Sequence, residues 1–137
     1  MTVEFGGAIA ARRRVLVVDD DALNRRAAEL LLARHPLEVV TVGDGQAALD
    51  LLAAESFDLV LLDDRMPAPD GPAVVAEIRR RGLLAGTRRL PVIAVTASFL
   101  PEDADRLLAA GVDGVLSKPL LADELDAVLR RWIQPLD

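Results

Sequence analysis

Short hydrophobic runs alternate with amphipathic stretches five times along the chain. The runs are rich in valine, leucine and isoleucine, which is typical of strands buried on both faces of a parallel sheet. Between them, hydrophobic residues recur at intervals of three and four, as in helices that pack one face against a sheet. The five predicted strands are Val15–Val18, Val39–Val42, Leu59–Leu62, Val92–Val95 and Val115–Ser117.

Turn and helix-start signals separate these stretches. The sequence Asp70-Gly71-Pro72 gives a turn followed by proline at a helix start, and Pro101-Glu102-Asp103 places proline and acids in a first helical turn. Alternating strands and helices with short links predict an α/β fold: a doubly wound, five-stranded parallel sheet with five helices. The strand order 2-1-3-4-5 of flavodoxin-like proteins fits, with ligands at the carboxyl ends of strands one and three.

The chain length of 137 residues predicts one domain. Residues 1–13 are interpreted as a short, weakly ordered tail, because their basic residues follow the hydrophobic ones, the reverse of a signal peptide. Residues 14–134 are expected to form the domain, with no effector domain beside it.

Composition excludes several kinds of site. The chain contains no cysteine and one histidine, His35, so disulfides, thiolate metal sites and histidine-rich metal sites are excluded. A net charge of −6 argues against nucleic acid as a partner. No hydrophobic stretch approaches the roughly 20 residues that span a bilayer. The sequence therefore predicts a soluble cytoplasmic domain with neither a nucleic-acid nor a membrane partner.

Polar residues gather where the predicted strands end. The first strand runs into three aspartates in VLVVDDD, and two carboxylates about 4 Å apart repel by about 4 kcal/mol at an effective dielectric near 20. All strands of a parallel sheet end at one edge, so the other strand ends should lie nearby. These strand-end residues are Asp19, Asp20, Asp21, Asp63, Asp64, Thr96, Ser98 and Lys118.

Carboxylates without imidazole or thiolate favour a hard divalent cation, Mg²⁺ or else Mn²⁺, which would also remove the repulsion. A lysine and a hydroxyl beside such a metal suit a phosphoryl group, whose oxygens carry negative charge. No serine–histidine or cysteine–histidine pair is evident to activate another nucleophile. The nucleophile would therefore be a carboxylate, and the product an acyl phosphate.

Four of these motifs together resemble those of response regulator receiver domains in two-component signalling. They are the acidic pair after strand one, LLDDRMPAPDG after strand three, VTAS after strand four and SKP after strand five, and the resemblance covers roughly residues 14–133. It implies that Asp63 accepts phosphate from a histidine. It also implies that Asp63 is itself a Mg²⁺ ligand, that Asp20 binds Mg²⁺ directly, and that Asp19 acts mainly through a metal-bound water. The backbone carbonyl of Arg65 is a further implied ligand.

The same resemblance assigns Thr96 and Lys118 to phosphoryl oxygens and implies a cis bond between Lys118 and Pro119. Asp64, one step along the strand from Asp63, should point elsewhere because side chains alternate. Receivers commonly carry tyrosine or phenylalanine three residues before the site lysine, whereas this chain has Val115. Phe99 is one candidate for the moving side chain that this position usually supplies.

Four other residues are expected to have structural roles only. Asp21 is expected to cap the first helix and Asp70 the third. His35, near the end of a helical stretch and before Pro36, is expected to be a solvated helix-end residue. Trp132 lies on the hydrophobic stripe of the last helix and should pack there.

The sequence thus predicts a stand-alone receiver that takes a phosphoryl group from a histidine kinase or a histidine phosphotransfer domain. It would act as a phosphorylation switch or a phosphorelay intermediate, and not as a turnover enzyme, although it would promote its own phosphorylation and slow hydrolysis. By resemblance, the partner would dock near Leu23, Asn24 and Pro119.

Three other functions fit the sequence less well. Asp19-x-Asp21 formally fits a Mg²⁺-dependent phosphohydrolase of the haloacid-dehalogenase type, but its acidic pair should follow the hydroxyl and the lysine, whereas residues 63–64 precede both. A flavin-binding carrier would need a glycine-rich phosphate loop where this chain has aspartates. A receiver used only as a scaffold would not need the complete set of site residues.

Overall fold

The structure is a computed structural model that describes residues 12–133. Most of the predicted tail, residues 1–11, lies outside the described residues, as do residues 134–137. The first strand begins at Arg13, so the last residue assigned to the tail belongs to the sheet.

Helices and strands alternate as predicted, with one addition. The strands are β2 (Arg13–Val18), β3 (Leu37–Val42), β4 (Leu59–Asp63), β5 (Leu84–Ala85), β6 (Arg88–Arg89), β7 (Val92–Thr96) and β8 (Gly114–Ser117). The helices are α1 (Ala22–Leu32), α2 (Gly45–Ala54), α3 (Gly71–Arg81), α4 (Pro101–Ala110) and α5 (Ala122–Trp132). Of the described helices, none is long and apolar enough to cross a membrane.

Five parallel strands form the central sheet in the order β3-β2-β4-β7-β8. In chain order this is 2-1-3-4-5, so the predicted fold is confirmed. Val15 of β2 pairs with Val39 of β3 on one side and with Leu59 of β4 on the other. Both β2 and β4 lie inside the sheet, with a strand on either side, which explains why their sequences are unbroken hydrophobic runs.

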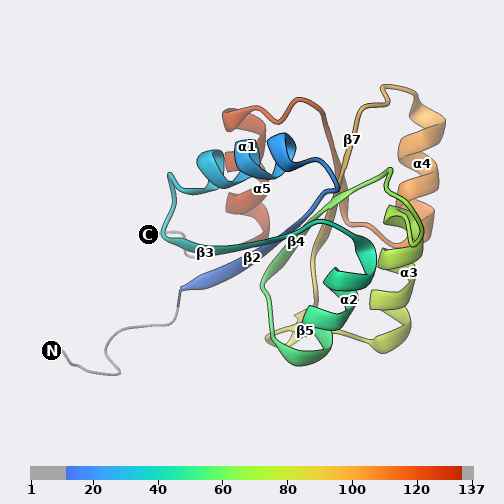
Figure 1. The fold of residues 1–137 in the computed structure, drawn as a ribbon, viewed down its shortest axis with the longest axis horizontal. Coiled ribbons are helices and arrows are strands. Elements are labelled where there is room, and N and C mark those ends of the chain that lie inside the picture. Colours follow the sequence, from blue (N-terminus) through green and yellow to red (C-terminus); the bar gives the residue numbers. More distant parts are fainter. Residues whose placement is uncertain (1–11, 134–137) are drawn as a thin grey trace, which may run out of the picture.

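Alternation along the strands divides the core into two layers. In β2, β3, β4 and β7, odd-numbered residues such as Val17 and Leu61 pack with α1 and α5, whereas even-numbered ones such as Val18 and Leu62 pack with α2, α3 and α4. In β8 the numbering is reversed, with Leu116 in the α1 and α5 layer. Figure 1 shows α1 and α5 on one side of the sheet and α2 and α3 on the other. The same alternation continues past the strand ends and decides which way the polar side chains there face.

Aspartates cap α1, α2 and α3 at the edge of the sheet where the strands end. Asp21 accepts hydrogen bonds from the backbone N–H groups of Leu23 and Asn24 at the start of α1. Asp70 caps α3 through the N–H of Ala73. The predicted capping roles of Asp21 and Asp70 are confirmed, and both groups satisfy N–H donors that have no partner within the helix.

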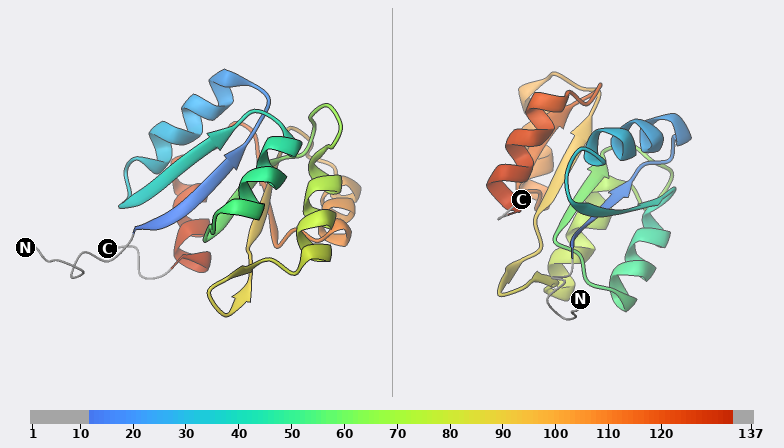
Figure 2. Two further views of the ribbon diagram at one scale, coloured as in Figure 1. Left: turned by 60° about the horizontal axis from the view of Figure 1, so that its bottom comes forward. Right: turned by 90° about the vertical axis from the view of Figure 1, so that its left-hand side faces the viewer.

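The sequence did not reveal a short hairpin between α3 and β7. Strands β5 and β6 have two residues each, pair in antiparallel fashion and project from the body of the molecule (Figure 2). Gly86 between them has a φ of 65°, a conformation that favours glycine. Two-residue strands are too short to produce a detectable hydrophobic period.

Arg79 of α3 fastens the end of α4 to the sheet. Its guanidinium donates to the backbone oxygens of Gly111 (3.0 Å) and Leu90 (2.6 Å) and to Oδ2 of Asp113 (2.8 Å). Asp113 also accepts the N–H of Val92 at the start of β7. One arginine thereby satisfies three acceptors, two in the connection between α4 and β8 and one just before β7.

His35 does not behave as predicted. Its Nε2 lies 2.7 Å from Oδ1 of Asp126 in α5, and its side chain is only 16% exposed, so the expectation of a solvated helix-end residue is wrong. The sheet brings the end of α1 beside α5, 91 residues away in sequence, and gives the histidine a carboxylate partner.

We expect Arg79→Met to lower the free energy of unfolding by about 2 kcal/mol, because it removes three hydrogen bonds and leaves the poorly exposed Asp113 to the exposed Arg89. Arg80→Met is the matched control. Arg80 is the next residue of the same helix, and its ion pair with Glu77 is exposed, so its loss should be much smaller. Urea denaturation followed by circular dichroism measures both, and equal losses would contradict the anchoring role of Arg79.

Candidate functional site

Three carboxylates meet where β2 and β4 end. Asp19 and Asp20 follow β2 directly, and Asp63 is the last residue of β4. One oxygen from each lies within 4.8 Å of the others. Asp19 and Asp63 are buried, whereas Asp20 is exposed. The structure therefore brings together the three carboxylates that the sequence predicted as metal ligands.

Main-chain geometry fixes this arrangement. Val18 pairs with Leu62, which places the next residue of each strand, Asp19 and Asp63, side by side. The N–H of Asp19 donates to the carbonyl of Val42 in β3, and Oδ1 of Asp19 accepts the N–H of Asp21. The Asp19 side chain is thus held in place before any ligand binds.

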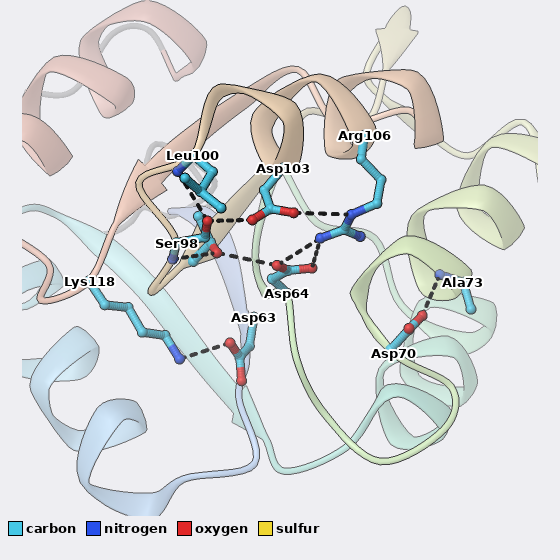
Figure 3. Close-up of polar contacts among 10 residues, drawn as sticks. Asp63, Asp64, Asp70, Ala73, Ser98, Leu100, Asp103, Arg106 and Lys118 are labelled. Atoms are coloured by element: carbon cyan, nitrogen blue, oxygen red, sulfur yellow. Dashed lines mark hydrogen bonds and ion pairs between the residues drawn. The ribbon is translucent and has the colours of Figure 1, made fainter.

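Lys118 provides the positive charge at this site. It directly follows β8, and its Nζ lies 2.8 Å from Oδ1 of Asp63 and 3.6 Å from Oδ2 of Asp19. Figure 3 shows the lysine side chain reaching across to Asp63. The predicted cis bond between Lys118 and Pro119 is present, and Ala68–Pro69 is also cis.

The charges at the site perturb one another. Burial raises the pKa of Asp63, and the charge of Asp19 raises it further, although the hydrogen bond from Lys118 opposes this rise. Burial by itself would lower the pKa of Lys118, but its hydrogen bond to Asp63 and the charges of Asp63 and Asp19 raise it overall. The ammonium group therefore stays charged at neutral pH, and it pairs with two of the three carboxylates, Asp63 and Asp19.

This donor set fits a hard divalent cation. It consists of oxygen atoms only, and the excess negative charge of the cluster would be neutralised by Mg²⁺ or Mn²⁺. Arg65 is exposed, and its backbone N–H opposes the rise in the pKa of Asp63. The role predicted for the Arg65 carbonyl as a further ligand stays a prediction.

Asp64 and Thr96 lie on the other face of the sheet. The Oγ1 of Thr96 donates to Oδ2 of Asp64 at 3.2 Å and accepts the N–H of Ser98 at 3.1 Å. Arg106 of α4 donates to both oxygens of Asp64, at 3.2 and 3.3 Å. The structure thus confirms that Asp64 points away from Asp63, and it shows the Thr96 hydroxyl bonded to Asp64.

Sequence reasoning did not find Arg106. Two consecutive acids after a buried strand imply that the second one enters the opposite layer, where it needs a cation. The sequence of α4 alone does not show that Arg106 supplies it, because the rotation and position of the helix on the sheet decide which side chains reach the strand end.

Gly71 lets α3 start directly against the Asp63 strand. A Cβ at this position would lie 2.6 Å from the carbonyl oxygen of Asp63 and 3.0 Å from the Cα of Asp64. Any larger residue would push the start of α3 away from the site. The glycine of the Asp70-Gly71-Pro72 turn therefore also lets α3 begin close to the acidic residues.

A pocket of about 100 Å³ lies beside Asp63, between α1 and the segment before α5. Asn24 and Ala27 of α1 line one side, and Pro119 and Leu120 line the other. Leu23, next to Asn24, has an 80% exposed side chain. The site is thus bordered by a partly apolar surface open to solvent.

Comparison with known proteins agrees with this geometry. The sequence pattern of the response regulator receiver domain matches residues 15–130. The chain is 44% identical over 115 residues to the sensor histidine kinase AruS of Pseudomonas aeruginosa, and 34% identical over 128 residues to the two-component response regulator ORR41 of rice, Oryza sativa subsp. japonica. These matches cover 84% and 87% of the chain, respectively. The chain spans 11% of the length of AruS and 93% of that of ORR41.

Solved structures show the same similarity. The receiver domain of a sensor histidine kinase from Pseudomonas aeruginosa, described with a magnesium ion coordinated in its active-site cleft, superposes with a TM-score of 0.79 at 36% identity, covering 90% of this chain and 98% of that one. The chemotaxis protein CheY4 of Vibrio cholerae superposes with a TM-score of 0.80 at 29% identity, covering 90% and 100%. From the sequence match, the fold and these relatives, the chain belongs to the response regulator receiver domain family.

Proposed function

We propose that the protein accepts a phosphoryl group on Asp63 in a Mg²⁺-dependent reaction and acts as a phosphorylation switch or a phosphorelay intermediate. The observation that carries this proposal is the pairing of the buried Asp63 with Lys118 beside two further carboxylates at the same edge of the sheet.

Asp63 is the nucleophile of the proposed transfer. One of its carboxylate oxygens attacks phosphorus, so a P–O bond forms while the P–N bond to the donor histidine breaks, and the electron pair of that bond stays on the imidazole nitrogen. Lys118 hydrogen-bonds Oδ1 of Asp63 in this structure. After the transfer, its ammonium group would bind a phosphoryl oxygen instead. Thr96 is assigned to a second phosphoryl oxygen.

Asp19, Asp20 and Asp63, with the backbone carbonyl of Arg65, would hold the metal ion. When bound, Mg²⁺ supplies positive charge that neutralises the carboxylates and the phosphoryl oxygens. The magnesium described in the related kinase receiver supports this assignment. The residues of this chain contribute the remaining positive charge through Lys118 and keep the acidic groups in position through backbone hydrogen bonds.

The phosphoryl donor is assigned to a histidine kinase or a histidine phosphotransfer domain in the cytoplasm. Matches to several sensor histidine kinases support this class of partner. The exposed Leu23, together with Asn24 and Pro119 at the pocket beside Asp63, is the proposed docking surface. The match to nearly the full length of a rice response regulator supports action as a stand-alone receiver.

The phosphohydrolase alternative is not favoured. The family match and the strand positions of the acidic residues place the chain among receivers, and the three-carboxylate cluster uses Asp19, Asp20 and Asp63, with Asp21 capping α1 instead. A receiver that serves only as a scaffold would have no need for the Lys118–Asp63 contact.

Acetyl phosphate should add one phosphoryl group to the wild type in the presence of Mg²⁺, and mass spectrometry should place it on Asp63. Labelling should be abolished in Asp63→Asn and by removal of the metal with EDTA. Asp105→Asn, which changes an exposed acid of α4, is the control and should label like the wild type. A label on any other residue would refute the proposal.

Magnesium binding should stabilise the fold, since a ligand that binds only the native state adds about 2.7 kcal/mol at 100 times its Kd. Asp20→Asn removes one carboxylate from an exposed position and should sharply reduce this increase, whereas Asp105→Asn should keep it. Thermal unfolding across a magnesium titration measures the effect. An equal increase in wild type and Asp20→Asn would rule out the assigned ligand set.

The metal-free protein should become more stable at neutral pH when Asp63 is replaced by asparagine. The pKa of Asp63 is raised above its ordinary value of 3.8 in the folded state, so the unfolded chain releases this proton first as the pH rises. The resulting loss of stability is absent below pH 3.8 and complete above the raised pKa. Urea midpoints of Asp63→Asn and wild type should therefore differ at neutral pH and converge on acidification. A difference that widens in acid would contradict this sign.

A further inference from the structure

A second buried carboxylate lies directly beside the proposed phosphoryl acceptor and has no part in the chemistry described so far. The side chain of Asp64 is 2% exposed, and its cation, Arg106, is 45% exposed and comes from α4. Figure 3 shows Arg106 reaching down to Asp64 while Lys118 reaches Asp63 from the other side. Two adjacent aspartates thus have separate cations.

Strand alternation puts Thr96 on the Asp64 side. Asp63 pairs with Val95 in the sheet, and both face α1 and α5, whereas the next residues, Asp64 and Thr96, turn toward the layer that contains α4. The hydroxyl of Thr96 has a single proton, and in this structure it is donated to Oδ2 of Asp64. The same proton cannot be donated to a phosphoryl oxygen on Asp63 at the same time.

Building on the function proposed above, we propose that Asp64 is a positioning residue that holds Thr96 in the resting orientation, and that Arg106 weakens this hold by sharing the same carboxylate. Phosphorylation of Asp63 would have to draw the Thr96 hydroxyl away from Asp64. The strength of the Thr96–Asp64 hydrogen bond therefore sets how readily the phosphorylated form is reached.

Arg106 modulates this hydrogen bond through charge. Its Nη2 lies 3.2 Å from Oδ2 of Asp64, the atom that accepts the Thr96 proton. A buried carboxylate that loses its cation keeps an uncompensated negative charge. That charge strengthens the hydrogen bond that Asp64 accepts from Thr96. Removing Arg106 should therefore tighten the hold on Thr96, and removing Asp64 should release it.

The contacts also connect Thr96 with the start of α4. The N–H of Ser98 donates to Oγ1 of Thr96, and the hydroxyl of Ser98 donates to Asp103 in the first turn of the helix. Asp103 in turn lies 3.7 Å from Nε of Arg106. A movement of Thr96 would thus disturb a series of polar contacts that ends on α4 at Asp103 and Arg106. The protein has valine at position 115.

The test uses opposite changes at the two ends of one ion pair. We expect Asp64→Ala to bind beryllofluoride, a phosphoryl mimic, about 10-fold more tightly in Mg²⁺, the equivalent of one hydrogen bond to a charged group. We expect Arg106→Met to bind it about 3-fold more weakly, within the range of a partly exposed ion pair. The double variant should behave like Asp64→Ala, because Arg106 acts only through Asp64.

Control variants separate this effect from loss of stability or of charge. Asp105→Ala removes an exposed acid from α4, and Arg80→Met removes an exposed arginine from α3; both should bind like the wild type. Asp64→Asn covers the case in which Asp64→Ala does not fold. It retains an acceptor of the same shape without charge and should show a smaller increase in affinity than Asp64→Ala.

A second readout needs neither metal nor phosphoryl group. Three-bond couplings to the Thr96 methyl group report its χ1 rotamer by NMR. The metal-free wild type and Arg106→Met should show one rotamer, whereas Asp64→Ala should show averaging between rotamers. The wild type with beryllofluoride should show the other rotamer.

The outcomes are distinct for the two proposals. If wild type shows neither labelling at Asp63 nor beryllofluoride binding, the function proposed above fails, and this inference falls with it. If wild type is labelled but Asp64→Ala and Arg106→Met both weaken binding or both leave it unchanged, only the positioning role of Asp64 is refuted. An unchanged Thr96 rotamer in Asp64→Ala would also refute it.

Discussion

The short contact between Lys118 and Asp63 offsets the central electrostatic strain of the structure. Parallel strands deliver Asp19, Asp20 and Asp63 to one edge of the sheet, where carboxylate oxygens lie within 4.8 Å of one another. Burial of Asp63 raises its pKa, and one ammonium group only partly compensates three negative charges. The site therefore favours additional positive charge, such as that of the divalent cation proposed above.

Side chains alternate between the two faces of a β-strand, so consecutive residues contact different partners. Asp63 continues the layer of Leu61 and meets Lys118, whereas Asp64 continues the layer of Leu62 and meets Arg106. Two acids that adjoin in the chain are thus kept in separate environments by the sheet between them. Thr96 falls on the Asp64 side for the same reason, and Asp64 connects it to Arg106 of α4.

Much of the fold and of the site was predictable because the signals are local or repeat with the sheet. Five hydrophobic runs at strand length gave the strands, and their polar ends gave the three carboxylates and Lys118. The β5–β6 hairpin escaped prediction because each strand has two residues. The contacts of Arg79 with Asp113 and of His35 with Asp126 escaped because they join segments 34 and 91 residues apart. The sequence between the two residues of each pair does not indicate that they are in contact.

The sequence by itself determined the order of strands and helices, the acids and the lysine at the strand ends, and the caps at Asp21 and Asp70, since each depends on near neighbours or on the period of the strand. Only the tertiary structure decided that Arg106 faces Asp64, that the Thr96 hydroxyl is donated to Asp64 and that His35 meets Asp126. These contacts depend on how each helix is rotated and placed on the sheet. That placement is set by packing of the whole core, which no short stretch of sequence specifies.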